Sequence, residues 1–338
     1  MADSNDDVLN QAANWLASGK GVALATVIGT WGSSPRPVGS QLAVMDDGEF
    51  VGSVSGGCIE GAVIGEGLSS ISDGKVRILD FGVTNEQAWE VGLACGGDIK
   101  IFVEKAGDHS DVSRLAIERP LASVTNIQTG ERSLVTSTGS EGEIDLSSDM
   151  LLTVHKALRD DRSQLCNQDG QSLFVHIFNP PLRMIIVGAV HISQALIPMA
   201  QTAGFEVTVV DPRGSFATDA RFPNVALINE WPDDALEALT PDARTAIVTL
   251  THDPKLDDPA LEKALNSDAF YIGSLGSKRT HASRLDRLRA SGFSAEILNR
   301  INGPIGLDLG AISPAEIAVA VLGEIIAAKH GKLETVSA

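Results

Sequence analysis

Cysteine is scarce in this sequence, and its scarcity excludes several kinds of site. The 338 residues include only three, Cys58, Cys95 and Cys166. Their spacing matches no zinc-binding pattern, and a low, odd number is typical of a reducing compartment rather than of a disulfide scaffold. The sets of about four cysteines that iron–sulfur clusters need are also missing.

Long apolar runs and basic residues are scarce as well. No stretch approaches the roughly 18 apolar residues of a membrane span, and the acidic, polar start MADSNDDVLN does not resemble a signal peptide. We therefore expect a cytoplasmic protein that does not associate with a membrane. With 26 basic against 44 acidic residues, the net charge is −18, which disfavours nucleic acid as a partner. A local basic pocket for one small phosphate is still allowed.

Two patterns follow one another along the chain. The first half mixes predicted strands and helices, with a strand over residues 21–30, a hairpin around residues 46–48 and a helix over residues 58–71. Beyond Pro180-Pro181, strands and helices alternate, which is the βαβ rhythm of a doubly wound parallel sheet. The sequence predicts a mixed α/β domain over residues 1–178 and a Rossmann-like domain over residues 179–338.

The second domain opens with a partial dinucleotide-binding turn. Of the G-x-G-x-x-G/A pattern only Gly188 fits, because Val190 occupies the position where the second glycine would let a pyrophosphate approach. His191 begins the following helix. Asp211 stands about 20 residues on, where a carboxylate that binds ribose is expected, and Arg213 could favour a 2′-phosphate or another anion. NAD(P) binding is therefore doubtful, and an ordinary strand-to-helix turn is the alternative.

Loops of the first domain carry candidate ligand-binding groups. Arg36 follows two serines in a glycine-rich loop, an arrangement suited to an anion. Cys58 stands at a strand-to-helix junction where a thiolate is favoured, and Glu60 is placed to accept N–H groups of a ligand. Cys95 has a similar Gly-Gly neighbourhood; tight turns around small buried cysteines are the alternative. The candidates are Ser33, Ser34, Arg36, Ser55, Gly56, Gly57, Cys58, Glu60 and Cys95.

In the second domain, polar loops follow two further predicted strands. His252 and Asp253 come after one, where ligands bind in parallel sheets; a loop histidine bonded to the aspartate is the alternative. Gly273 and Ser277 belong to a loop of small residues before Lys278 and Arg279, which suits a phosphate or carboxylate, or simply begins a helix. That helix carries three arginines, for which we expect a solvated face: Arg284, Arg287 and Arg289.

Taken together, seven segments in order resemble the XdhC/CoxI family of accessory proteins for xanthine dehydrogenase and carbon monoxide dehydrogenase. The likeness runs from about Val22 to Ile326. The segments are GSSPRPVGSQLAV, GSVSGGCIEGAV, CGGDIKIFVE, VGAVHIS with VTVVDPR, THDPKLDDPAL, YIGSLGSKRTHASRL and PIGLDLGAISPAEIAVAVLGEI. The family turn usually reads Gly-Ala-Gly-His, so Val190 is a departure.

The resemblance implies a cofactor chaperone rather than an enzyme. Such proteins bind the molybdenum cofactor, a pterin dithiolene that sometimes carries a cytosine nucleotide. They hold it while a cysteine desulfurase partner supports its sulfuration, and deliver it to an apo molybdenum hydroxylase. Cys58 and Cys95 are the candidate molybdenum ligands or sulfur carriers. We also expect a homo-oligomer.

Two other functions stay open at this point. One is an NAD(P)-dependent oxidoreductase, in which Asp211 binds ribose and His252 acts as acid and base. The other is a protein that binds neither ligand and only bridges partners.

Overall fold

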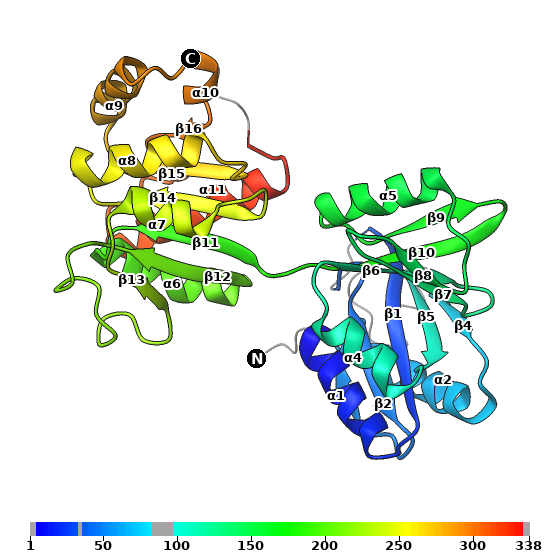
Figure 1. Ribbon diagram of the computed structural model, residues 1–338. Helices are drawn as coiled ribbons and strands as arrows, with labels where there is room; N and C mark the ends of the chain where they lie inside the picture. The colour runs from blue at the N-terminus through cyan, green and yellow to red at the C-terminus, as the bar shows by residue number, and fades with distance from the viewer. Residues whose placement is uncertain (1–4, 33–35, 83–96, 334–338) are drawn as a thin grey trace. The chain divides into compact units, whose positions relative to one another are not determined.

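The computed structural model describes residues 5–32, 36–82 and 97–333. By its contacts the chain divides into two compact units, Met1–Pro180 and Pro181–Ala338 (Figure 1). Each unit is described by itself. Whether residues 1–178 and 179–338 fold as separate domains stays a prediction. Within the described ranges, no helix has the length and apolar character needed to cross a membrane.

The first unit begins with an antiparallel sheet in the order β3-β2-β1-β5-β4. Its strands are β1 (Val22–Trp31), β2 (Gln41–Met45), β3 (Phe50–Gly52), β4 (Arg77–Phe81) and β5 (Asp98–Lys105). The predicted hairpin is confirmed, with Val44 opposite Phe50. Because side chains alternate along a strand, Val22 and Leu24 of β1 pack in one apolar cluster and Ala23 and Ala25 in another.

Helices supply the rest of these two clusters. Residues of α1 (Asn5–Ala17) and α4 (His109–Ile117) belong to the cluster of Val22, and Val63 of α2 (Glu60–Asp73) belongs to that of Ala23. Burial on both faces explains why β1 reads as a continuous apolar run instead of an alternating one.

A second antiparallel sheet completes the first unit. Its order is β8-β7-β6-β10-β9, and its strands are β6 (Leu121–Asn126), β7 (Arg132–Val135), β8 (Ser140–Gly142), β9 (Gln164–Gln168) and β10 (Gln171–Phe178). The predicted helix is α5 (Ser148–Arg159), and Ser147 caps it by accepting a hydrogen bond from the Met150 amide at 3.2 Å. Val154 of α5 packs with Val124 and Val175 of this sheet.

The second unit is built on a parallel sheet in the order β13-β12-β11-β14-β15-β16. Its strands are β11 (Leu182–Val187), β12 (Phe205–Val210), β13 (Ala226–Ile228), β14 (Thr245–Thr249), β15 (Tyr271–Ser274) and β16 (Ile301–Asn302). Counted within this unit the order is 3-2-1-4-5-6, which is the doubly wound arrangement. The predicted fold class, a mixed α/β part followed by a Rossmann-like part, is confirmed.

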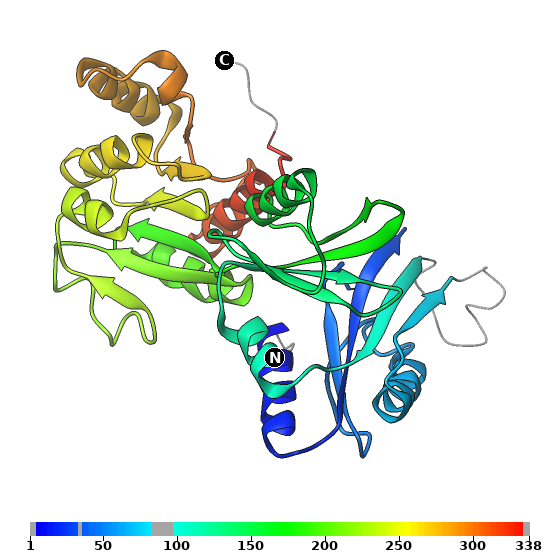
Figure 2. The same ribbon diagram turned by 45° about the vertical axis from the view of Figure 1, so that its right-hand side comes forward.

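Helices cover both faces of this sheet. Residues of α6 (His191–Thr202) and α11 (Pro314–Lys329) pack in the cluster that contains Ile186. Residues of α8 (Pro254–Leu265), α9 (Lys278–Ala290), α10 (Ala295–Leu298) and α7 (Pro232–Leu239) pack in the cluster that contains Ile185. Figures 1 and 2 show α8 and α11 on opposite sides of the sheet. In such a sheet, ligands bind where the strand order reverses, here between the carboxyl ends of β11 and β14.

Candidate functional site

Cys58 is exposed on the loop that joins β3 to α2. The loop turns at Gly56 and Gly57, whose φ angles are 84° and 116°. These are values that residues with a Cβ rarely adopt. The predicted group Ser55, Gly56, Gly57 and Cys58 is therefore one continuous turn with a thiol on its surface.

The carboxylate of Glu60 organises this turn. Oε1 accepts hydrogen bonds from the Ser53 hydroxyl at 2.7 Å and from the amides of Ser55 and Gly56 at 2.9 and 3.1 Å. Oε2 accepts from the Ser55 hydroxyl at 2.5 Å and from the Gly57 amide at 2.9 Å. Successive amides that converge on one point form an anion-binding concavity, and here the bound anion is the protein's own side chain.

The electrostatics of Glu60 agree with this geometry. Its side chain is buried, and burial alone would raise the pKa. The hydrogen bonds from Ser55 and Ser53 outweigh that effect and lower the pKa from 4.5 to about 2. Since both oxygens already serve the loop, Glu60 is placed to shape the turn beneath Cys58. A direct bond from Glu60 to a ligand stays a prediction.

Arg36 connects a second loop to the same turn. Its Nε donates a hydrogen bond to the Ser53 carbonyl at 3.1 Å. The guanidinium and the Cys58 turn are thus joined through one residue, as an anion-binding role for both would require. Ser33, Ser34 and Cys95 lie outside the described residues.

No metal site is formed by the part of the chain that the structure describes. Within it, no group of three or more His, Cys, Asp or Glu side chains is placed to hold a metal ion. The predicted pair of Cys58 and Cys95 lies partly outside this part of the chain, so it stays a prediction. Cys166 lies half-buried in β9, where burial raises the pKa of its thiol.

In the second unit, Gly188 ends β11 and allows two loops to approach closely. Its φ is 118°, and a Cβ at this position would lie 2.8 Å from Cγ2 of Thr251, in the loop that follows β14. The Ser193 hydroxyl donates to the Gly188 carbonyl at 2.5 Å. Val190 is the residue before α6, and its side chain packs against the apolar core.

Asp211 is fully buried and engaged within the protein. It accepts hydrogen bonds from the Ala189 amide at 2.8 Å and from Arg213 Nε and Nη2 at 2.8 and 2.7 Å. Burial alone would raise the pKa of Asp211, but these bonds leave it lowered. Arg213 also lies over the Phe216 ring, 4.3 Å from its centroid. A ribose bond to Asp211 stays a prediction, and it would require Arg213 to turn away.

The other predicted residues of this unit lie at the ends of helices and strands. His191 is exposed, with Nδ1 3.2 Å from Oε1 of Gln194. Asp253 caps α8 by accepting a hydrogen bond from the Lys255 amide at 3.0 Å, and Ser277 caps α9 by accepting one from the Thr280 amide at 3.1 Å.

Two of the predicted residues are set by backbone geometry. His252 is exposed with a φ of 60°, which is uncommon for a residue with a side chain. Gly273 lies inside β15, where a Cβ would come within 2.5 Å of Ile305 Cδ1. The structure thus gives this glycine a packing role.

The expectation of a solvated arginine face on α9 is wrong for Arg284. Its side chain is only 2% exposed and lies 3.7 Å from Asp257, which is equally buried. Arg284 shares the buried face of α9 with Leu288, four residues later, and this spacing was the available signal. Arg287 and Arg289 are exposed, as predicted.

These observations define a class: a two-unit α/β protein with a reactive thiol on the first unit and a Rossmann-like second unit. Family models make the assignment specific. The model described as the XdhC and CoxI family matches residues 15–82, and the one described as the XdhC Rossmann domain matches residues 184–325. The chain belongs to the XdhC and CoxI family.

Relatives and solved structures agree with this assignment. The chain is 29% identical to the Escherichia coli molybdenum cofactor insertion chaperone PaoD, over 96% of this chain and 89% of that protein. It is 28% identical to a Bacillus subtilis protein named as a probable subunit of xanthine dehydrogenase, over 90% and 92%. A Bacillus halodurans protein described as a xanthine dehydrogenase has the same fold, with a TM-score of 0.76 at 24% identity, over 99% and 98% of the two chains.

Proposed function

We propose that this protein binds the molybdenum cofactor as cargo and inserts it into an apo molybdenum hydroxylase, without catalysing turnover of a small substrate itself. The relative PaoD, named as a molybdenum cofactor insertion chaperone, aligns with nearly the whole chain. The observation that carries the proposal is the Cys58 turn, because it presents an exposed thiol on a backbone that Glu60 fixes.

The chemistry of this turn suits the cargo. Thiolate is a soft ligand that molybdenum can accept while the cofactor is in transit, and the same sulfur can carry the sulfido group. Arg36 lies one hydrogen bond away through Ser53, where a guanidinium can hold an anionic group. Glu60 acts as a positioning residue, since it touches the loop rather than the cargo.

Several finer roles belong to the same proposal. A cysteine desulfurase partner would supply sulfur while the cofactor is held, and Cys95 would be a second ligand or sulfur carrier. The protein would act as a homo-oligomer that shields the cargo. The cargo would be the molybdopterin cofactor or its cytosine dinucleotide form.

An NAD(P)-dependent oxidoreductase is the second candidate. The strand order of the second unit favours it, because this is the arrangement that binds dinucleotides. Val190 and the pairing of Asp211 with Arg213 oppose it. Calorimetry with NAD⁺ and NADP⁺ on the protein used below decides between the two.

The test of the main proposal is anaerobic incubation of the full-length protein with isolated molybdenum cofactor, followed by desalting and measurement of retained molybdenum and pterin. We expect near-stoichiometric retention by the wild type, at least tenfold loss in Cys58→Ser or Cys95→Ser, and wild-type retention in Cys166→Ser. Cys166 is the matched control because it lies half-buried in β9. Equal retention in all variants, or none in the wild type, would reject the proposal.

A further inference from the structure

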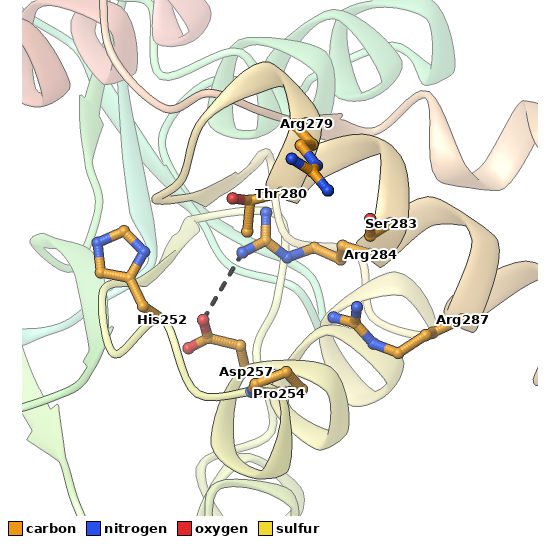
Figure 3. Close-up of a pocket in the computed structure, with 8 residues that line it drawn as sticks. All are labelled: His252, Pro254, Asp257, Arg279, Thr280, Ser283, Arg284 and Arg287. Atoms are coloured by element: carbon orange, nitrogen blue, oxygen red, sulfur yellow. Dashed lines mark ion pairs between the residues drawn. The ribbon is translucent and has the colours of Figure 1, made fainter.

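A pocket of about 250 Å³ lies in the second unit between the loop after β14 and the helix α9. Figure 3 shows its lining, with the guanidinium of Arg284 between Thr280 and Asp257. The lining residues are His252, Pro254, Asp257, Arg279, Thr280, Ser283, Arg284 and Arg287. Four of these eight side chains carry a guanidinium or an imidazole.

Arg284 is buried in this wall without a full set of partners. Its Nη2 donates to the Leu275 carbonyl at 2.8 Å, but Nε and Nη1 have no hydrogen-bond partner although both are buried. The carboxylate of Asp257 comes no closer than 3.7 Å, and its Oδ2 also has no hydrogen bond. A buried charge with idle donors is costly, so this geometry points to an acceptor that the protein itself does not supply.

The charges around the pocket leave a positive excess. Arg287 is neutralised by Asp258 through two bonds of 2.5 and 2.9 Å. Asp257 offsets Arg284. Arg279 is exposed and, among the residues that the structure describes, has no ion pair or hydrogen bond. The pocket is thus positive in a chain whose net charge is −18.

The backbone adds to this excess. Arg279 and Thr280 lie in the first turn of α9, a helix of 13 residues that Ser277 caps. The N-terminal end of a helix carries partial positive charge and unpaired amides, which favour an anion. His252 faces the pocket from the loop after β14 with its φ at 60°, a strained backbone of the kind found at ligand sites.

We propose that this pocket binds a phosphate group, as a phosphate ester or a pyrophosphate. Guanidinium nitrogens of Arg284 and Arg279, together with the hydroxyls of α9, surround the space from several directions, which matches a tetrahedral oxyanion better than a planar carboxylate. The site goes beyond the proposed function, because it does not depend on the identity of the cargo. Its ligand is either the phosphate end of the bound cofactor or a separate nucleotide.

The test is calorimetric titration of the full-length protein with inorganic pyrophosphate at low salt. We expect binding by the wild type and about tenfold or greater weakening in Arg279→Ala. Arg284→Lys keeps the charge but loses the planar fork, and we expect a similar loss. Arg289→Ala is the matched control, because Arg289 is exposed on the same helix and pairs with Asp286 outside the pocket; it should bind within twofold of the wild type.

The outcomes separate the site from the proposed function. No binding by the wild type, or equal binding by Arg279→Ala and Arg289→Ala, would overturn the site. Since Arg279 is exposed, its variant stays interpretable even if Arg284→Lys fails to fold. If Arg279→Ala loses pyrophosphate and also loses molybdenum cofactor, the ligand is the phosphate end of the cargo. If it loses pyrophosphate alone, the ligand is a separate nucleotide. A wild type that binds pyrophosphate but retains no cofactor supports the site and rejects the chaperone.

Discussion

Glu60 in the first unit and Arg284 in the second are both buried charges, but their surroundings differ. Both oxygens of Glu60 are saturated by hydroxyls and amides of its own loop. Arg284 makes one hydrogen bond to a carbonyl and leaves two buried nitrogens without partners. A saturated charge is part of the fold, whereas an unsaturated one marks a place for something from outside.

The comparison predicts its largest effect at Glu60. Glu60→Gln puts an amide N–H₂ among donors that have lost their acceptor, and we expect a loss of about 3 kcal/mol in the free energy of unfolding. Urea denaturation measures this, and amide hydrogen exchange over residues 53–59 should rise locally. Glu66→Gln is the control on the same helix, because Glu66 is about half exposed and pairs with Arg77 at the surface. A loss no larger than in this control would contradict a structural role for Glu60.

The second prediction concerns pH and the same carboxylate. Its pKa is about 2 in the folded protein and 4.5 as the reference value. The unfolded chain therefore binds the proton first as pH falls, and the stabilisation is complete above about pH 4.5 and disappears toward pH 2. The gap of about 3 kcal/mol between wild type and Glu60→Gln should shrink across this window. A gap that is constant from pH 6 to pH 3 would show that the ionised carboxylate is not its source.

The smallest effect is expected where the buried charges serve a ligand. In Arg284→Met with Asp257→Asn, the pair is removed together and Thr251 keeps a hydrogen-bond acceptor. We expect the free energy of unfolding to stay within about 1 kcal/mol of the wild type, as for other buried pairs replaced by residues of similar size, while pyrophosphate binding is lost. A loss as large as that of Glu60→Gln would mean that Arg284 supports the fold in the way Glu60 does.

Much of the architecture could be predicted because it follows from local patterns. The strand β1, the hairpin at residues 46–48 and the alternation beyond Pro181 are visible in the apolar spacing and the turn residues. The capping box at Ser313 and Glu316, expected from residue type and spacing alone, is present. Each of these features depends on neighbours within about ten residues, which is why the sequence is sufficient.

The two buried charges could not be assigned in this way. Residue type and position predict that Glu60 serves a ligand, but its partners are amides that converge only because Gly56 and Gly57 adopt left-handed φ values. The same reasoning predicts a solvated Arg284, but α8 and the loop after β14 bury it against Asp257. In both cases the deciding contact depends on backbone geometry or on a distant segment.

The sequence by itself determined the family, the fold class and the residues of the Cys58 turn, because motifs and hydrophobic periodicity are properties of neighbouring positions. The tertiary structure alone decided which charges are satisfied. Whether a buried carboxylate or guanidinium finds its partners depends on how loops and helices meet in space, and that depends on packing across the whole unit.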